Sequence, residues 1–116
     1  MDASKVSLLA ATFILADLLP VALAATGTAT FYNPPYVPSA CYGNQNKGVM
    51  IAAASDAIWG NRAACGRKYR VTCTGVVVTI VDYCPPGCQG TIDLSRKAFS
   101  TIANLDAGKI QIRYNR

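Results

Sequence analysis

Five cysteines lie between Cys41 and Cys88 in a chain of only 116 residues. A core this small gains much from cross-links, and disulfides persist mainly in proteins that leave the cell. Each bridge contributes ~2–4 kcal/mol to the free energy of unfolding. The cysteines therefore indicate a small, disulfide-stapled secreted fold, and their odd number leaves one thiol over.

The proximity of Cys84 and Cys88 in the segment Cys84-Pro-Pro-Gly-Cys88 would also suit a pair of metal ligands. The chain has no histidine, however, and aspartate is its only acidic residue type, so the choice of ligands is poor. Export would also expose the thiols to oxidation. We expect no metal and no cofactor.

The N-terminus has the polarity order of a secretory signal. Lys5 precedes the apolar run Val6–Leu23, and Ala22-Leu23-Ala24 offers small residues for cleavage. The alternative is a membrane anchor or a buried helix, against which Asp17 and Pro20 argue. We expect residues 1–24 to be a signal peptide that is removed after Ala24, and residues 25–116 to form one secreted domain.

Basic residues outnumber acidic ones in the expected mature chain. Residues 25–116 hold 10 basic and 4 acidic side chains, a net charge of +6. Such a domain suits an anionic partner, such as an acidic wall polysaccharide or phospholipid headgroups. Nucleic acid would satisfy the same charge, but we do not expect it as a partner of an exported chain without a matching motif. We expect a monomer with no membrane span.

Short segments of alternating polarity predict an all-β domain. The segment 33–39 contains three prolines and must be a loop. Ser55 and Asp56 offer capping oxygens for a short turn, and Ser95 is a candidate N-cap for a helix over 96–103. The expected strands are 27–32, 48–54, 68–73, 76–81, 91–94 and 109–114. Six short strands in so few residues favour a compact barrel, because closure removes the sheet edges.

Several blocks of the chain together resemble the EG45-like domain of expansin-related proteins. They are Gly27–Tyr32 (GTATFY), Ala40–Gly43 (ACYG), Val81–Cys84 (VDYC) and Ile92–Phe99 (IDLSRKAF). The block Cys65–Val71 (CGRKYRV) looks like the plant natriuretic peptide subgroup. The resemblance implies a six-stranded double-psi β-barrel like the first domain of expansins, a plant origin and a location in the apoplast.

The resemblance also implies a disulfide pattern. Cys41 would pair with Cys65, and Cys84 with Cys88, which leaves Cys73 unpaired. Relatives carry a loop with a further cysteine after Gly75, and this chain lacks that loop. A truncation by splicing or in the gene model, and a functional free thiol, both remain open explanations.

Asp93 occupies the place that, in the related family 45 glycosidases, belongs to the general acid. Asp82 and Thr30 match other polar residues of the groove. Inverting hydrolysis needs a second carboxylate as base, and the glycosidase base position has no acidic counterpart here. Of the other acids, we expect Asp56 to be a cap and Asp106 to lie in a turn. A pair made by Asp82 and Asp93 stays conceivable, but we expect no catalytic residues and no enzyme.

The subgroup resemblance implies signalling in water and solute balance through recognition of a cell-surface receptor. The expected recognition loop extends from Pro34 to Cys65, with Pro34, Pro35, Tyr36, Tyr42 and Trp59 as contact residues. The prolines could equally serve only to route the chain, and Trp59 could be a core residue. The alternative function is non-hydrolytic binding or loosening of wall polysaccharide, with Tyr32 and the same aromatic residues along a groove.

Overall fold

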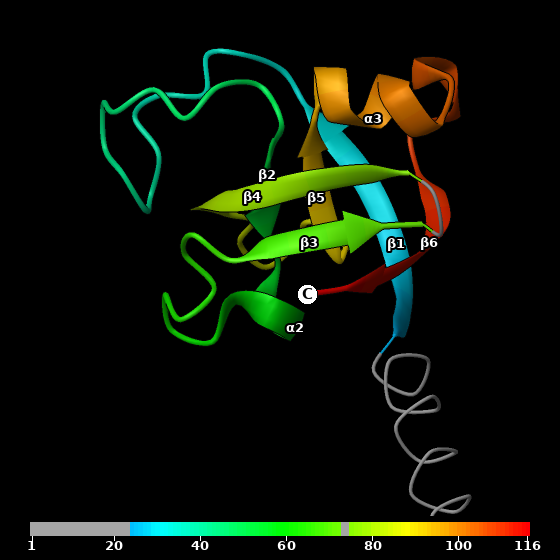
Figure 1. Ribbon diagram of the computed structural model, residues 1–116, viewed down its shortest axis with the longest axis horizontal. Coiled ribbons are helices and arrows are strands. Elements are labelled where there is room, and N and C mark those ends of the chain that lie inside the picture. Colours follow the sequence, from blue (N-terminus) through cyan, green and yellow to red (C-terminus); the bar gives the residue numbers. More distant parts are fainter. Residues whose placement is uncertain (1–23, 73–74) are drawn as a thin grey trace, which may run out of the picture.

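The computed structural model describes residues 24–72 and 75–116, and its strands are connected by loops and three short helical segments (Figure 1). The expected signal peptide before Ala24, and Cys73, lie outside the described residues. The elements in chain order are β1 (Ala25–Tyr32), β2 (Ile51–Ala54), α2 (Asp56–Trp59), β3 (Lys68–Val71), β4 (Val76–Tyr83), β5 (Ile92–Ser95), α3 (Arg96–Ile102), η1 (Leu105–Ala107) and β6 (Ile110–Asn115).

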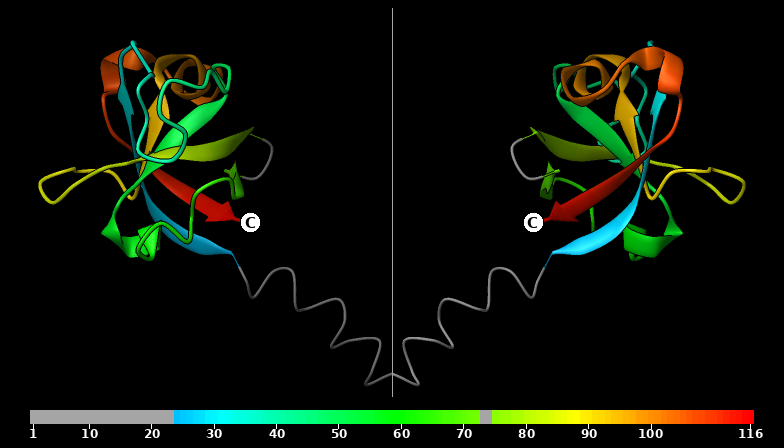
Figure 2. Two further views of the ribbon diagram at one scale, coloured as in Figure 1. Left: turned by 90° about the vertical axis from the view of Figure 1, so that its left-hand side faces the viewer. Right: turned by 90° about the vertical axis from the view of Figure 1, so that its right-hand side faces the viewer.

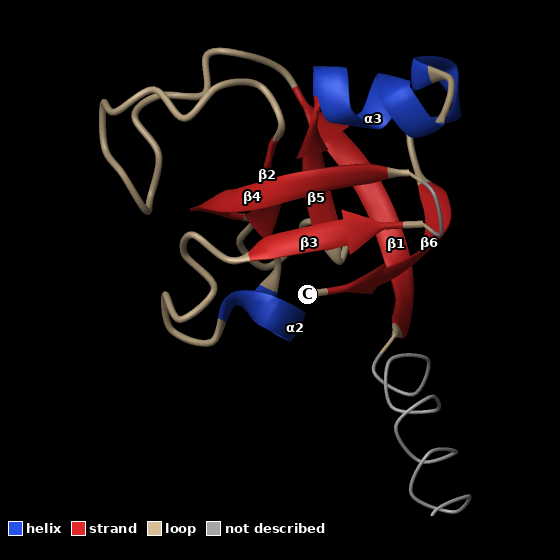
Figure 3. Cartoon of the chain, in the orientation of Figure 1, coloured by secondary structure: helices blue, strands red, loops and turns tan. Residues whose placement is uncertain are grey.

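The six strands close into one barrel in the order β1-β5-β2-β4-β3-β6 (Figure 3). The pairs β1/β5 and β2/β4 are parallel, and all other neighbouring pairs are antiparallel. Closure leaves no unpaired sheet edge among these strands. The all-β, six-stranded double-psi barrel that the sequence predicts is therefore confirmed.

The core forms where alternate side chains of the strands point inward. On β4, Val76, Val78 and Ile80 are buried while Val77 is exposed, which is the period-2 pattern of a half-buried strand. Helix α3 covers one end of the barrel with Ala98 and Phe99, both completely buried (Figure 1). The short α3 thus covers the apolar interior at this end of the barrel.

The predicted N-cap at Ser95 is confirmed. The Ser95 hydroxyl accepts a hydrogen bond from the Ala98 backbone N–H at 3.1 Å, and it donates to the backbone carbonyl of Val49. Ser95 is fully buried, so both of these bonds are sheltered from water. One side chain therefore starts α3 and fixes the loop that leads into β2.

Two local expectations are wrong. The buried strand expected over 48–54 begins only at Ile51, since Val49 is 51% exposed and Met50 37%. These two residues precede the ladders that β2 forms with β4 and β5, so nothing covers them. Ser55 does stand at the N-cap of α2, but its side chain makes no capping hydrogen bond.

Disulfides join Cys41 to Cys65 and Cys84 to Cys88, the two pairs that the resemblance implied. The first ties the long loop between β1 and β2 to the turn that precedes β3. The second closes the base of the loop between β4 and β5, which projects from the side of the barrel (yellow in Figure 2). No helix within the described ranges has the length and apolar character needed to cross a membrane.

Candidate functional site

A row of three polar residues and one alanine crosses four neighbouring strands of the barrel; it is called the polar row below. Thr30 of β1 lies opposite Asp93 of β5, Asp93 lies opposite Ala53 of β2, and Ala53 lies opposite Asp82 of β4. Neighbouring strands are ~4.8 Å apart, so the Cα atoms of the two aspartates are roughly 10 Å apart. The structure therefore brings together the three groove residues that the resemblance implied, with a methyl group between the two carboxylates.

Asp93 is held at the centre of this row by contacts on both sides. The Thr30 hydroxyl donates to its Oδ1 at 2.8 Å, and Oδ2 lies 3.7 Å from the sulfur of Cys84. Burial raises the pKa of the Asp93 carboxyl above its ordinary value, whereas the hydrogen bond from Thr30 acts in the opposite direction. The protonated form of Asp93 therefore persists to a higher pH than that of an exposed aspartate.

Asp82 has different surroundings. Its Oδ1 accepts hydrogen bonds from the backbone N–H groups of Ala40, at 2.9 Å, and Tyr83, at 3.0 Å. The first bond anchors the loop between β1 and β2 to β4, and the second lies within β4 itself. Asp82 thus holds the loop between β1 and β2 in place and is also part of the polar row.

Tyr32 lies two residues after Thr30 and therefore on the same face of β1. Its hydroxyl is buried and has no hydrogen-bond partner among the described residues. Burial, followed by the negative charges of Asp82 and Asp93, strongly raises the pKa of Tyr32. The hydroxyl therefore stays neutral, and it can both donate to and accept from a ligand beside the two carboxylates.

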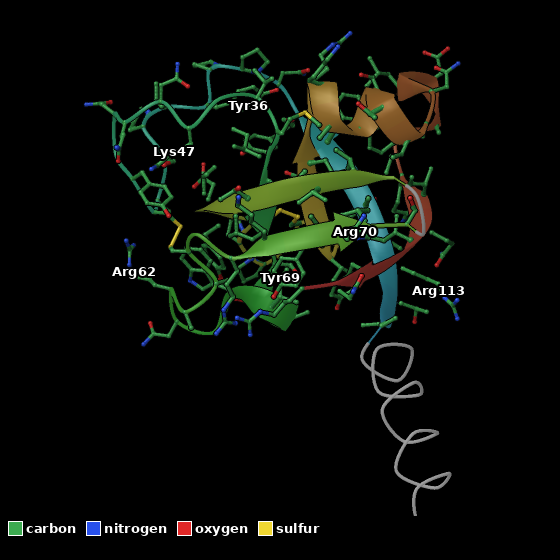
Figure 4. The ribbon with its side chains drawn as sticks, viewed as in Figure 1. Tyr36, Lys47, Arg62, Tyr69, Arg70 and Arg113 are labelled. Carbon is green, nitrogen blue, oxygen red and sulfur yellow. A yellow bond between two sulfur atoms is a disulfide. The ribbon has the colours of Figure 1, made fainter. Side chains whose placement is uncertain are left out.

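Tyr36 fixes the start of the expected recognition loop. Its hydroxyl donates to the Tyr32 carbonyl at 3.0 Å and accepts from the Arg96 N–H at 3.0 Å. Its ring packs edge-on against Tyr32 with the centroids 5.0 Å apart. Tyr36 is labelled near α3 in Figure 4, so it connects the loop to both β1 and the helix that covers the barrel.

Of the other expected contact residues, Pro34 lines a hollow together with Tyr36, whereas Tyr42 and Trp59 lie elsewhere. Pro34 and Pro35 are exposed, and Tyr42 is half-buried under the ammonium of Lys47, 4.3 Å from the ring centroid. Trp59 belongs to α2 at the opposite end of the barrel from α3, where it packs against the core and against Tyr83 (Figure 1). The expected recognition loop over 34–65 is therefore not one loop, because β2 and α2 interrupt it, and Trp59 is largely a packing residue away from the loop between β1 and β2.

A hollow of about 290 Å³ adjoins the row beside the second disulfide. The sequence did not lead us to expect this hollow, although a glycine at position 90 is an indication of close packing there. A Cβ atom at Gly90 would collide with the Thr30 hydroxyl, so only glycine allows this close approach. The hollow is lined by Ser55, Asp56, Ala57, Cys84, Pro85, Pro86, Cys88, Gln89, Gly90 and Thr91.

Asp56 lines this hollow and accepts a hydrogen bond from the Tyr83 hydroxyl. The expectation that Asp56 caps α2 is therefore wrong: Asp56 stands in the first turn of α2, but its carboxylate accepts from a side chain of β4. Asp106 lies in the first turn of η1, which agrees with the turn expected there.

One cluster has the proximity of a metal site. The sulfurs of Cys84 and Cys88 and a carboxylate oxygen of Asp93 lie within 4.8 Å of one another. Both sulfurs are bonded to each other, so neither is the thiolate that a metal would need. We assign no metal to this cluster.

Comparisons with known proteins agree with this architecture. The family model DPBB_1, described as lytic transglycolase, matches residues 51–114. An EG45-like domain containing protein of Citrus jambhiri is 56% identical over 118 aligned positions, covering 90% of each chain. EG45-like domain containing protein 2 of Arabidopsis thaliana is 44% identical, covering 84% of each chain.

A solved structure is similar as well. It is a mutant expansin of Clavibacter michiganensis in complex with cellohexaose, with a TM-score of 0.63 and 32% identity. The match covers 78% of this chain and 48% of that expansin, so this chain spans about half of its length. The fold and these similarities together show that the chain belongs to the EG45-like, expansin-related family.

Proposed function

We propose that this protein is an extracellular, wall-associated module that binds a neutral polysaccharide along the row of Thr30, Asp93, Ala53 and Asp82 without hydrolysing it. The observation that carries the proposal is the register of this row, with the Tyr32 hydroxyl beside both carboxylates. Carboxylates, hydroxyls and a tyrosine edge are the groups that bind sugar hydroxyls through hydrogen bonds.

The geometry favours binding over hydrolysis. Asp93 resembles a general acid because burial raises the pKa of its carboxyl, but hydrolysis also needs a base that can take a proton from water. Asp82, the other carboxylate in the row, already accepts two backbone hydrogen bonds through one oxygen. Its arrangement therefore suits a fixed acceptor for a sugar hydroxyl better than a base.

The cellohexaose complex of the similar expansin supports a β-linked glucan as the class of ligand. The row runs across strands that are ~4.8 Å apart, so it can contact successive hydroxyls of an extended chain. The hollow beside the Cys84–Cys88 bridge extends the polar surface beyond Asp93.

Calorimetric titration with cellohexaose tests the proposal. Thr30→Val and Tyr32→Phe should each weaken binding by about tenfold, since each removes one hydrogen-bonding group. The matched controls are Thr101→Val on the exposed face of α3 and Tyr114→Phe on β6, which should bind like the wild type. Equal affinity of all four variants would refute the site, and release of reducing ends by the wild type would refute the non-hydrolytic role.

A second candidate is the signalling role in water and solute balance. It is favoured by the way the loop between β1 and β2 is held, by the Cys41–Cys65 disulfide, by Tyr36 and by the Cys41 N–H, which donates to the Val81 carbonyl at 3.0 Å. A loop already ordered loses less conformational entropy when it binds a receptor.

Protoplast swelling separates the two functions. A signalling protein should lose its effect in the double variant Cys41→Ser, Cys65→Ser but keep it in Asp93→Asn. Equal responses of the wild type and the double variant would show that the ordered loop is not needed for signalling. N-terminal sequencing of exported protein, with Ala25 as the expected first residue, tests the extracellular location.

A further inference from the structure

A line of three cations crosses the side of the barrel that lies away from the polar row. Lys68 and Arg70 alternate on β3 with the buried Tyr69 and Val71, so both basic side chains face outward. Arg113 of the neighbouring β6 is exposed on the same outer face. Lys68, Arg70 and Arg113 are called the cationic stripe below.

The strand register sets the course of the stripe. Lys68 and Arg70 are two residues apart on one strand, which separates their Cα atoms by ~6.5–7 Å. Arg70 lies opposite Asn115 of the antiparallel β6, so Arg113 is its diagonal neighbour, ~7–8 Å away and further along the same direction. Figure 4 shows Arg70 on β3 and Arg113 on the side of the barrel where β6 and β1 lie. Three positive charges therefore follow one another at similar intervals.

Within the described residues, β1, β3 and β6 contain no acidic residue, and the one acid of the flanking β4, Asp82, lies beyond the stretch that pairs with β3. The cross-strand neighbours of the stripe are Thr79, Val77, Asn115 and Thr26, all uncharged. Three of the four described acids are engaged elsewhere: Asp93 with Thr30, Asp56 with Tyr83 and Asp82 with backbone N–H groups. Asp106 lies in η1. The positive potential over the stripe is thus uncompensated.

We infer that the cationic stripe binds an acidic polysaccharide, an extended chain whose carboxylates repeat at regular intervals. A line of cations at similar spacing matches the carboxylates of such a chain. A planar lipid surface would instead be matched by cations that are spread over a whole face of the protein. Two of the three side chains are arginines, whose planar guanidinium groups pair bidentately with carboxylates. Charge complementarity therefore selects a polyuronate as the occupant.

The stripe and the polar row occupy different strands of the closed barrel. The row uses β1, β5, β2 and β4, and the stripe uses β3 and β6. One molecule can therefore hold an acidic chain on one side and a neutral chain on the other. The acidic-polysaccharide site does not depend on the proposed groove function and stands if that function fails.

Affinity electrophoresis through polygalacturonate tests the inference in the full-length secreted protein. The variant Lys68→Gln, Arg70→Gln, Arg113→Gln should lose binding by about tenfold or more at constant salt, because it removes the line of charges. The control Lys47→Gln, Arg62→Gln, Lys97→Gln removes the same charge from exposed positions elsewhere and should change binding less than about twofold. Equal losses in the two variants would show that net charge alone acts and would overturn the site.

Two further measurements separate the remaining explanations. Sedimentation with phosphatidylserine vesicles should show weaker binding than with polygalacturonate, and the reverse order would overturn the choice of polysaccharide. Thermal unfolding should be the same for wild type and both triple variants. If the stripe variant unfolds early, Arg70→Gln is compared with Lys97→Gln in its place, and an equal effect of these single changes would likewise refute the stripe.

Discussion

The Thr30 hydroxyl donates a hydrogen bond of 2.8 Å to the Asp93 carboxylate across the parallel pair of β1 and β5. The two residues are 63 positions apart in the chain, and the closed barrel makes them direct neighbours. This bond stabilises the ionised form of a carboxylate that burial otherwise disfavours. The balance between the two effects decides which protonation state Asp93 presents to a ligand.

Replacing Thr30 by valine should raise the pKa of the Asp93 carboxyl further. The substitution keeps the shape of the side chain but removes the hydrogen bond that lowers this pKa, and burial remains. Titration of the Asp93 carboxyl carbon by NMR measures the change. Thr101→Val is the control, and an unchanged or lower pKa in Thr30→Val would show that the bond does not favour the ionised form.

Asp93→Asn should change how stability depends on pH. Because the pKa of Asp93 is higher in the folded than in the unfolded chain, the folded state binds more protons between the two values. The free energy of unfolding therefore falls as pH rises from about 4 through the folded pKa, and asparagine abolishes this contribution. Urea unfolding across that range should give a flatter profile for Asp93→Asn than for the wild type. Parallel profiles would contradict the raised pKa.

Ser95→Ala should cost ~1–3 kcal/mol of the free energy of unfolding. It removes the cap from the Ala98 N–H and leaves the Val49 carbonyl without its buried donor. Denaturant unfolding gives the difference. Ser100→Ala removes a hydroxyl from the same helix at an exposed position and should change stability by less than about 0.5 kcal/mol. Equal effects of the two changes would show that the buried bonds of Ser95 contribute little.

The double variant Cys41→Ser, Cys65→Ser should lose ~2–4 kcal/mol of the free energy of unfolding, because the bridge closes a loop of sequence separation 24. Hydrogen exchange should also become faster at the Cys41 N–H, which bonds to the Val81 carbonyl. Protection equal to that of the wild type would mean that the loop is ordered without the bridge.

The alternation of apolar and polar residues was sufficient to predict strands such as β3 and β4. β3 alternates exposed and buried residues along its length, and β4 does so over its first half, as their sequences indicate. The segment from Gly48 to Met50 is apolar too, but it precedes the registered ladders of β2, and only its last carbonyl, that of Met50, bonds to β4, so Val49 and Met50 stay exposed. Apolar composition alone cannot reveal whether a ladder partner exists.

The polar row shows what only the closed fold could supply. The resemblance implied Thr30, Asp82 and Asp93 as groove residues, but their alignment depends on the parallel pairing of strands far apart in the chain. Ala53, which separates the two carboxylates, carries no chemical signal of its own. The Tyr32 hydroxyl was expected only as part of an aromatic groove, and its burial beside two acids follows from the packing of Tyr36.

An NMR titration of the labelled protein with cellohexaose tests the proposed groove most directly. The backbone amide signals that move should cluster at Thr30, Tyr32, Ala53, Asp82 and Asp93, while cellohexaose itself remains intact. Signals that move instead over β3 and β6, or no movement at saturating sugar, would contradict it.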